Sequence, residues 1–391
     1  AGFELPRDQV YLDGNSLGAL HARVRARLAT VVSEEWGDSL IAGWNDHRWI
    51  DLPLTVGDRL APLLGAGPGE VLCCDSLSVN LFKAFAAALE INAPRTRIVT
   101  EASHFPTDNY IARGISALLG VERCQVDALP MADIAQLDFD DVAVLSLSHV
   151  NFRTGALRDL GELTQRAHAG GALVLWDLAH SAGVVETQLG AHEADLAVGC
   201  TYKFLNGGPG APGFLYMARR HQWAGNAIPG WMGHADRFAF EADYRPVEGI
   251  ARFLTGTQSV VAMSAVDAAL SVFDDIDIPS LRAQSLALSD GFLQALAGHE
   301  ATRQLECLTP LNHAARGSQI SLRLEHGFPV SQALIADGVV VDFRDPDIVR
   351  FGFSPLYNTQ DDVHTAATRL ADILDSKRYE LRQFTTRKTV T

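Results

Sequence analysis

The amino-acid sequence predicts an α/β protein with a mostly parallel sheet in a large unit, followed by a smaller α+β unit. Two runs, Val142–Leu147 (VAVLSL) and Ala172–Leu178 (ALVLWDL), are almost entirely apolar, as strands buried on both faces of a sheet are. Between about residues 70 and 220, short β-branched runs alternate with longer amphipathic stretches, which is typical of βαβ units. After about residue 280 this alternation ends, which indicates a separate unit.

Strand and helix signals follow one another along the large unit. Runs rich in Val, Ile and Leu favour strands, and the amphipathic stretches between them favour helices. The expected strands are Arg97–Thr100, Val121–Val126, Val142–Leu147, Ala172–Leu178, Asp195–Thr201 and Gly213–Met217. The expected helices are Asp108–Leu119 and Leu160–Ala169, followed by a long linking helix in Gln258–Asp275.

The smaller unit mixes helices with strands in a less regular order. Its expected helices are Leu281–Leu296, Ser331–Ala336 and Gln360–Asp375. Its expected strands are Gln319–Leu324, Val339–Phe343 and Ile348–Phe353.

The composition is that of a folded protein with an acidic surface. Of its 391 residues, 47% are hydrophobic, and the formal net charge is −15. Negative charge repels phosphate backbones and anionic lipid head groups, so neither nucleic acid nor a membrane is expected as a partner. The five cysteines are an odd number without a C-x-x-C pair, which favours reduced thiols. Because the sequence also shows neither a bilayer-spanning apolar run nor a signal-peptide pattern, we expect a cytoplasmic protein.

Two charged residues follow neighbouring expected strands, where ligands bind in open α/β sheets. Asp177 closes the run ALVLWDL, and Lys203 follows the next strand and precedes the glycine-rich turn 207–210 (GGPG). They are 26 residues apart (203 − 177), so parallel neighbouring strands would place both at one rim of the sheet. Singly, Asp177 could cap a helix and Lys203 could be a surface residue beside a turn. Together they suit a pyridine cofactor, whose nitrogen a carboxylate keeps protonated and whose aldehyde a lysine holds as a Schiff base.

A third feature, Asp75–Asn80 (DSLSVN), opens a helix-like run that extends to Leu89. Small hydroxyl residues at a helix start either cap the helix or hold a phosphate together with the free backbone amides. Capping alone is the more common use. Alongside a lysine and an aspartate of the required kinds, we expect the phosphate role.

These three features, in this order, resemble the fold-type-I family of pyridoxal-phosphate enzymes, and the finer pattern resembles the kynureninases. The matching segments run from residue 11 to about residue 358. They are Tyr11–Gly18 (YLDGNSLG), Phe105–Asp108 (FPTD), Asp177–Gly183 (DLAHSAG), Tyr202–Asn206 (YKFLN), Pro229–His234 (PGWMGH) and Arg350–Asn358 (RFGFSPLYN). The resemblance implies the fold-type-I architecture, pyridoxal 5'-phosphate as cofactor, and hydrolysis of L-kynurenine to anthranilate and L-alanine in tryptophan catabolism.

The resemblance also implies a division of the chain and a set of site residues. Residues 1–50 would form an N-terminal segment that packs with the small domain, 51–275 the large cofactor-binding domain and 276–391 the small domain. The expected catalytic residues are Lys203, Tyr202 and Asp177. The expected cofactor contacts are Leu77, Ser78, Phe105, Asp108, Asp177, His180, Tyr202, Lys203, Trp231 and Thr257. The expected substrate contacts are Arg350, Trp44, Asn151 and Gly256. No metal site is expected.

By this resemblance, Lys203 would carry the cofactor and move the substrate's α-proton, and Arg350 would clamp the substrate carboxylate. Tyr202 is our candidate acid–base group, because it stands beside the lysine. Phe105 would stack on the cofactor ring, although a core aromatic is the simpler alternative. Asn151 is a candidate polar contact at the ring.

The remaining contacts imply a homodimer. Trp231 and Thr257 would reach the phosphate of the neighbouring subunit's cofactor. Trp44 and Gly256 would lie by the aryl group of the substrate, which favours unsubstituted kynurenine over its 3-hydroxy form. The alternative is that Trp44 only packs the N-terminal segment.

Other enzymes of the same architecture are the main alternatives. A cysteine desulfurase-like lyase typically has a histidine before the lysine and a catalytic cysteine on a late loop. Here Tyr202 precedes the lysine, and Cys307 lacks that context. An aminotransferase is a second alternative. A non-catalytic relative that binds the cofactor should have lost Lys203, Asp177 or Arg350, and all three are present.

Overall fold

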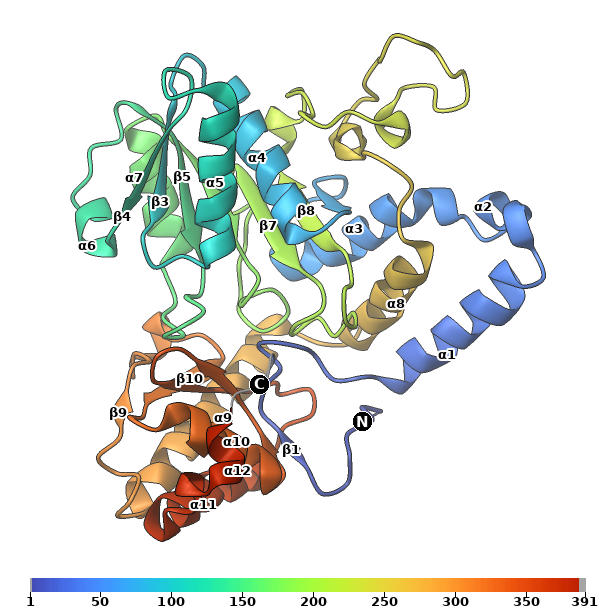
Figure 1. The fold of residues 1–391 in the computed structure, drawn as a ribbon. Helices are drawn as coiled ribbons and strands as arrows, with labels where there is room; N and C mark the ends of the chain where they lie inside the picture. Colours follow the sequence, from blue (N-terminus) through green and yellow to red (C-terminus); the bar gives the residue numbers. More distant parts are fainter. Residues whose placement is uncertain (1, 387–391) are drawn as a thin grey trace.

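The computed structural model describes residues 2–386, which form a large unit and a smaller unit packed against each other (Figure 1). The large unit is built on a seven-stranded sheet in the order β2-β8-β7-β6-β5-β3-β4. Strands β3 to β7 pair in parallel, whereas β8 pairs antiparallel with β7 and β2. The strands are β2 Val71–Cys73, β3 Arg97–Glu101, β4 Gln125–Leu129, β5 Val142–Ser148, β6 Leu173–Asp177, β7 Leu196–Cys200 and β8 Gly213–Met217.

Helices cover both faces of this sheet, which explains why its central strands are apolar throughout. Leu175 of β6 packs in one cluster with α4 and α5, and the adjacent Trp176 packs in another with α3, α7 and α8. Trp176 also donates a hydrogen bond from Nε1 to Thr164 of α7 at 3.1 Å. The helices of this unit are α3 Leu52–Leu64, α4 Leu77–Ile91, α5 Pro106–Leu119, α6 Met131–Ile134, α7 Leu160–Ala169 and α8 Val260–Leu270.

The smaller unit is a four-stranded antiparallel sheet in the order β12-β13-β10-β9, covered by helices. Phe292, Phe351 and Phe353 lie at the centre of its core, with ring centroids 4.6 and 5.6 Å from Phe292. Its strands are β9 Glu306–Cys307, β10 Gln319–Arg323, β12 Asp342–Arg344 and β13 Ile348–Gly352. Its helices are α9 Ile278–Gly298, α10 Gly327–Ala336, α11 Gln360–Ser376 and α12 Arg382–Thr385.

The N-terminal segment touches both units. Strand β1 (Val10–Tyr11) pairs in parallel with β11 (Val339–Val340), and Val10 and Leu12 belong to the core of the smaller unit. Helix α1 (Ala22–Thr30) instead packs along α8, and α2 (Gly43–Asp46) lies beyond it, at the right of Figure 1. Our division of the chain at residues 50 and 275 stays a prediction.

The predicted α/β class with a mostly parallel sheet is confirmed, and several element boundaries differ from expectation. Helix α5 ends at Leu119, and the amides of Arg123 and Cys124 donate to the carbonyl of Gly120, so the next strand begins at Gln125 rather than Val121. The run Val339–Phe343 contains two strands rather than one, because its first half pairs with β1 and its second half with β13. The linking helix is also shorter, ending at Leu270. Among the described residues, none of the helices combines the length and apolar character needed to cross a membrane.

Candidate active site

Asp177 and Lys203 meet at the carboxyl ends of β6 and β7. These strands are parallel neighbours, with Asp177 opposite Val198 of β7. Lys203 lies in the turn that follows β7, and its Nζ is 2.9 Å from Nε2 of His180, in the turn that follows β6. The sequence spacing therefore predicted this proximity correctly, because each side chain follows one of two paired strands.

The N-terminal segment lies directly on the turn that carries Lys203. The Gly18 amide donates to the carbonyl of Tyr202 at 2.8 Å. A Cβ at Gly18 would lie 2.3 Å from the Lys203 carbonyl oxygen, so only glycine fits there. This contact explains the final glycine of the YLDGNSLG segment and fixes the backbone of the lysine turn.

Asp177 performs a local structural task and also faces a cavity. Its Oδ1 accepts a hydrogen bond from the Ala179 amide at 2.8 Å, which closes the turn after β6. The helix cap that we considered as an alternative is not formed, because turns rather than a helix follow Asp177. The residue also lines the cavity that contains Lys203. Burial raises the pKa of Asp177, and both that hydrogen bond and the positive charge of Lys203 oppose the rise.

Asp108, in the first turn of α5, is buried beside Asp177. Neither of its carboxylate oxygens has a hydrogen-bond partner within residues 2–386. Burial raises the pKa of Asp108 well above its usual range, and the negative charge of Asp177 raises it further. Two facing carboxylates in a dry site need a cation or a donor between them. A protonated ring nitrogen satisfies this need, so the pair fits a pyridinium.

Two histidines in the site are neutral. His104 lies with Nδ1 3.4 Å from Oδ1 of Asp108 and 3.1 Å from the Ser148 hydroxyl. Burial lowers the pKa of His104 to about 3. Burial, and then the charge of Lys203, hold the pKa of His180 well below its usual range. The histidines therefore act as hydrogen-bonding groups rather than as cations.

His104, Asp108 and Asp177 also offer ligand atoms within 4.8 Å of one another, a spacing that could hold a metal ion. The expectation that the protein has no metal site stays a prediction.

One cavity gathers most of the predicted cofactor contacts. Phe105 stands at its rim, 41% exposed, with its ring edge-to-face against Phe152 at 5.2 Å. Ser76 caps α4 by accepting from the Val79 amide at 3.3 Å, and Leu77 and Ser78 form the first turn of that helix, whose free amides suit a phosphate. The residues lining the cavity are Leu77, Ser78, Phe105, Thr107, Ser148, Phe152, Asp177, Ala179, His180, Tyr202 and Lys203.

Tyr202 lines the same cavity, with its ring centroid 6.0 Å from Nζ of Lys203. The neighbouring Cys200 and burial both raise the pKa of the Tyr202 hydroxyl, which therefore stays protonated at neutral pH. A protonated hydroxyl beside the lysine can donate a hydrogen bond or a proton to a reacting oxygen.

Arg350 is fully buried in β13 and is already paired. Its Nε lies 2.6 Å from Oδ1 of Asp342, and its Nη2 donates to Oδ2 of the same carboxylate. Nη1 donates to the carbonyl of Phe152 at 2.5 Å, and Nη2 also donates to Ser16 at 3.2 Å. The anion that a buried guanidinium requires is therefore within the chain, and Phe152 connects Arg350 to the cavity wall.

The other predicted contacts lie away from this cavity in the single chain. Trp231, 37% exposed, packs edge-to-face on Phe238. Trp44 packs on Trp49 with ring centroids 6.0 Å apart and also against the core of the large unit, and its place beside the aryl group stays a prediction. Gly256 faces open space, since an added Cβ would meet nothing within 4 Å in the described part of the chain, and Thr257 follows it.

Asn151 serves its own loop. Its Oδ1 accepts from the amides of Arg153 and Thr154, and its Nδ2 donates to the carbonyl of Ser103 at 3.1 Å. These bonds fix the loop after β5, from which the adjacent Phe152 reaches the cavity.

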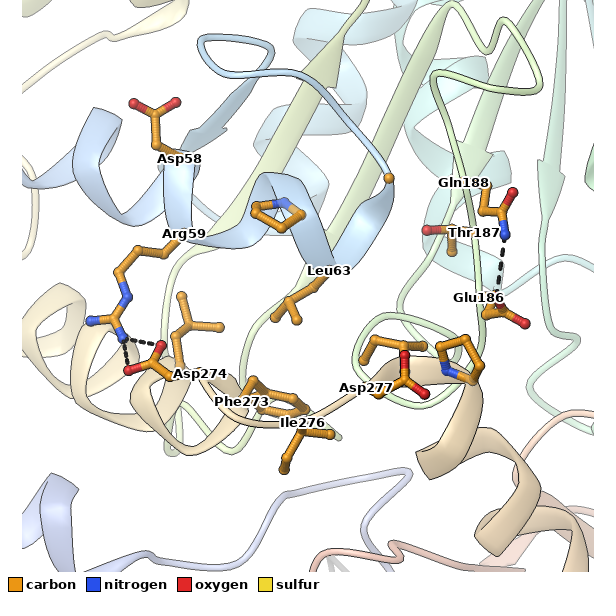
Figure 2. Close-up of a pocket in the computed structure, with 15 residues that line it drawn as sticks. Asp58, Arg59, Leu63, Glu186, Thr187, Gln188, Phe273, Asp274, Ile276 and Asp277 are labelled. Atoms are coloured by element: carbon orange, nitrogen blue, oxygen red, sulfur yellow. Dashed lines mark hydrogen bonds and ion pairs between the residues drawn. The ribbon is translucent and has the colours of Figure 1, made fainter.

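A separate hollow of about 610 Å³ lies between α3, residues 186–188 and the start of α9 (Figure 2). Arg59 in its wall is paired with Asp267 and Asp274, and Glu186 accepts a hydrogen bond from Gln188. With four carboxylates and one guanidinium in its lining, this hollow repels anions such as phosphates. It is therefore unsuited to the cofactor.

The fold, the paired lysine and aspartate, the buried carboxylate pair and the helix start define a fold-type-I pyridoxal-phosphate enzyme. Solved structures support the fold: a cysteine desulfurase from Thermococcus onnurineus matches with a TM-score of 0.81 at 18% identity, covering 96% of this chain and 97% of that one. A C-DES variant with glycine covalently linked to its PLP cofactor matches with a TM-score of 0.79, also at 18% identity, covering 94% and 97%.

Sequence relatives identify the family. The kynureninase of Deinococcus radiodurans is 50% identical over 381 residues, which cover 96% of this chain and 92% of the relative. The kynureninase of Burkholderia pseudomallei is 48% identical over 396 residues, which cover 100% and 95%. A family model described as the kynureninase C-terminal domain matches residues 281–370. The chain belongs to the kynureninase family.

Several residues of the site were missed by the sequence analysis, including Thr107, Phe152 and Ala179 in the cavity wall. Among them, His104 lies against Asp108, Ser148 lies against His104, and Asp342 holds Arg350. His104 directly precedes Phe105-Pro106, and Ser148 ends an apolar strand, so both carried a weak positional signal. Asp342 carried none, because its partner is fixed only by the pairing of β12 with β13.

Proposed function

We propose that this protein hydrolyses L-kynurenine to anthranilate and L-alanine with pyridoxal 5'-phosphate held on Lys203. The observation that carries the proposal is the cavity in which Lys203, Asp177, Phe105 and the start of α4 converge, in a chain of the kynureninase family. Each of these features suits one part of the cofactor: aldehyde, ring nitrogen, ring face and phosphate.

The cofactor site follows from the donors and acceptors of the cavity. Asp177 and Asp108 would hold the protonated ring nitrogen, Phe105 would cover the ring, and the first turn of α4 with Leu77 and Ser78 would hold the phosphate. When bound, the cofactor supplies a cationic ring that accepts the electron pair released at the substrate's α-carbon. The buried carboxylates keep that ring protonated, because the cation relieves their mutual repulsion.

Lys203 and His180 would manage the proton at the α-carbon. With substrate in the site, Nζ of Lys203 would be the base that takes that proton. Neutral His180, 2.9 Å from Nζ, orients the amine through a hydrogen bond without competing for its charge.

Tyr202 would serve the substrate's ketone. Its protonated hydroxyl can donate to the carbonyl oxygen as water adds and accept the proton back as the carbon–carbon bond breaks. Arg350 would hold the substrate carboxylate through its Nη1/Nη2 edge, since Asp342 occupies Nε and one hydrogen of Nη2. The substrate would have to replace at least one of the bonds that this edge makes to the Phe152 carbonyl and to Ser16.

A homodimer would complete the site. Trp231 and Thr257 lie outside the cavity of their own chain, which supports the expectation that they serve a second copy. Trp44 and Gly256 also lie outside it, and we keep them as the residues expected beside the aryl group. Large hydrophobic side chains are exposed near these segments, including Trp36, Leu40, Phe238 and Phe240.

The five free cysteines favour the cytoplasm. We keep the preference for unsubstituted kynurenine, which comparison of both substrates would test.

The test is incubation of the purified protein with L-kynurenine and pyridoxal phosphate while fluorescent anthranilate and alanine are measured. We expect both products in equal amounts, and borohydride treatment should leave a pyridoxyl group on Lys203 that peptide mass spectrometry locates. Lys203→Ala is the control and should form neither product. Release of sulfide from cysteine without anthranilate from kynurenine would instead identify a desulfurase.

A further inference from the structure

Lys83, in the second turn of α4, is a fully buried lysine that the proposed reaction does not use. Its side chain is 0% exposed. Its Nζ lies 2.5 Å from Oδ2 of Asp75 and 2.5 Å from the carbonyl oxygen of Phe253. Burying an ammonium is costly unless it is paired, so a lysine at this position must be held by these two acceptors.

The two acceptors belong to the two segments expected at the phosphate end of the cofactor. Asp75 begins the loop that leads into Ser76, Leu77 and Ser78 at the start of α4. Phe253 ends the short helix Ile250–Phe253, which leads directly into residues 254–257. These segments are far apart in the sequence, and the ammonium of Lys83 joins them.

The Asp75 loop needs such a restraint. Asp75 has a φ of +46°, a left-handed conformation that costs most side chains stability. Its carbonyl accepts from the Gly213 amide at 2.7 Å, which fixes the loop on β8. The ion pair with Lys83 fixes the side chain of Asp75, so both the backbone and the side chain of this residue are held.

We propose that Lys83 is a positioning residue for the cofactor phosphate, because it fastens the loop of its own site and the segment 253–257 that would serve the partner's site. This inference rests on the proposed function. It predicts that Lys83 acts on the phosphate end of the cofactor and leaves the ring end unchanged.

The experiment measures binding to the cofactor-free protein by titration with pyridoxal phosphate and with pyridoxal, which lacks the phosphate. Lys83→Met should weaken pyridoxal phosphate about tenfold or more, equivalent to ~1.4 kcal/mol, and pyridoxal less than about twofold. Asp75→Asn, at a partly exposed position, should show the same selectivity if Lys83→Met does not fold. Lys83→Arg should recover part of the affinity.

Asp290→Asn is the matched control, because it breaks the ion pair of Arg316, a cation of similar burial in the smaller unit. It should lower the unfolding temperature of the cofactor-free protein but leave both ligands' affinities unchanged. If Lys83→Met and Asp75→Asn lowered the affinities for pyridoxal and for pyridoxal phosphate equally, or lowered neither, the inference about Lys83 would be overturned. The proposed function would not be affected by that result. Wild-type protein that bound no pyridoxal phosphate would overturn the proposed function as well.

Discussion

Asp342 and Arg350 face each other across strands β12 and β13, and the carboxylate of Asp342 accepts hydrogen bonds from both Nε and Nη2 of Arg350. A substrate carboxylate must therefore bind an arginine that is already paired with the carboxylate of Asp342. The pair fixes the guanidinium plane and therefore the orientation of its Nη1/Nη2 edge, which donates to the Phe152 carbonyl and to Ser16.

This geometry predicts that Asp342→Asn raises KM for kynurenine about tenfold, with a smaller effect on kcat, because Arg350 loses one charged partner and its fixed orientation. Arg350→Lys should lower kcat/KM by about a hundredfold, since an ammonium lacks the planar fork. Steady-state kinetics check both, with Asp290→Asn as a control whose KM should equal that of wild type. An unchanged KM in Asp342→Asn would show that Asp342 does not position the arginine.

Tyr202→Phe should lower kcat by about a hundredfold while exchange of the substrate's α-proton with deuterated solvent continues. The reason is that Lys203 moves that proton, whereas the Tyr202 hydroxyl acts later, at the ketone. Mass spectrometry of recovered kynurenine measures the exchange. Tyr216→Phe is the control, because that buried hydroxyl donates to the Ala194 carbonyl away from the cavity. Full turnover by Tyr202→Phe would exclude the acid–base role.

Mixed dimers test whether Trp231 and Thr257 serve the neighbouring subunit. Lys203→Ala and the double variant Trp231→Ala/Thr257→Ala should each be impaired alone. Refolded together they should regain activity, because a hybrid has one site with an intact lysine and an intact partner segment. Mixing Lys203→Ala with Tyr202→Phe should restore nothing, since both changes lie in the same subunit's site. Failure of the first mixture to gain activity would contradict the shared site.

Asp13 predicts a pH-dependent stability. Its Oδ1 is buried and accepts no hydrogen bond from residues 2–386, and burial, followed by the charge of Asp342, raises the pKa of Asp13 to about 7. The folded state therefore holds the proton more tightly than the unfolded chain, and stability falls as pH rises from about 4 to about 7. Asp13→Asn should raise the unfolding temperature at about pH 8 and change it little near pH 4. A constant difference across this range would contradict the assignment.

His168 predicts a second pH-dependent contribution to stability, which comes from a hydrogen bond to Asp195. Its Nε2 lies 2.7 Å from Asp195, which also accepts from His221 at 2.8 Å, and the Asp195 hydrogen bond raises the pKa of His168. Protonated His168 is bound more strongly in the folded state than in the unfolded chain, so it stabilises the fold below about pH 6.5. This contribution is lost as pH rises through the pKa that His168 has in the folded state. His168→Gln should lower the unfolding temperature more at about pH 5.5 than at about pH 9. Thermal unfolding by circular dichroism measures both, and a larger loss at the higher pH would contradict the prediction.

Local patterns were sufficient for most strands of the large sheet and for the residues that follow them, whereas β2 was not expected and β4 begins at Gln125 rather than Val121. The apolar runs that became β5 and β6 could only be strands covered on both faces, and parallel pairing then required Asp177 and Lys203 to meet at one rim. The helix start at Ser76–Ser78 was equally local, because capping is decided by the residues themselves.

Contacts between distant segments were beyond those patterns. Asp342 meets Arg350 because Val339–Phe343 divides between two sheets, and Lys83 meets Phe253 because residues 250–257 return across α4.

The sequence by itself determined the fold class, the lysine–aspartate pair and the family motifs, since these depend on periodicity and on residues next to strand ends. Only the tertiary structure decided which partner each buried charged group has. The energy of a buried charge depends on its surroundings and on the distance to its partners, and chain order fixes neither of these for residues as far apart as Lys83 and Phe253, whose carbonyl accepts from the ammonium.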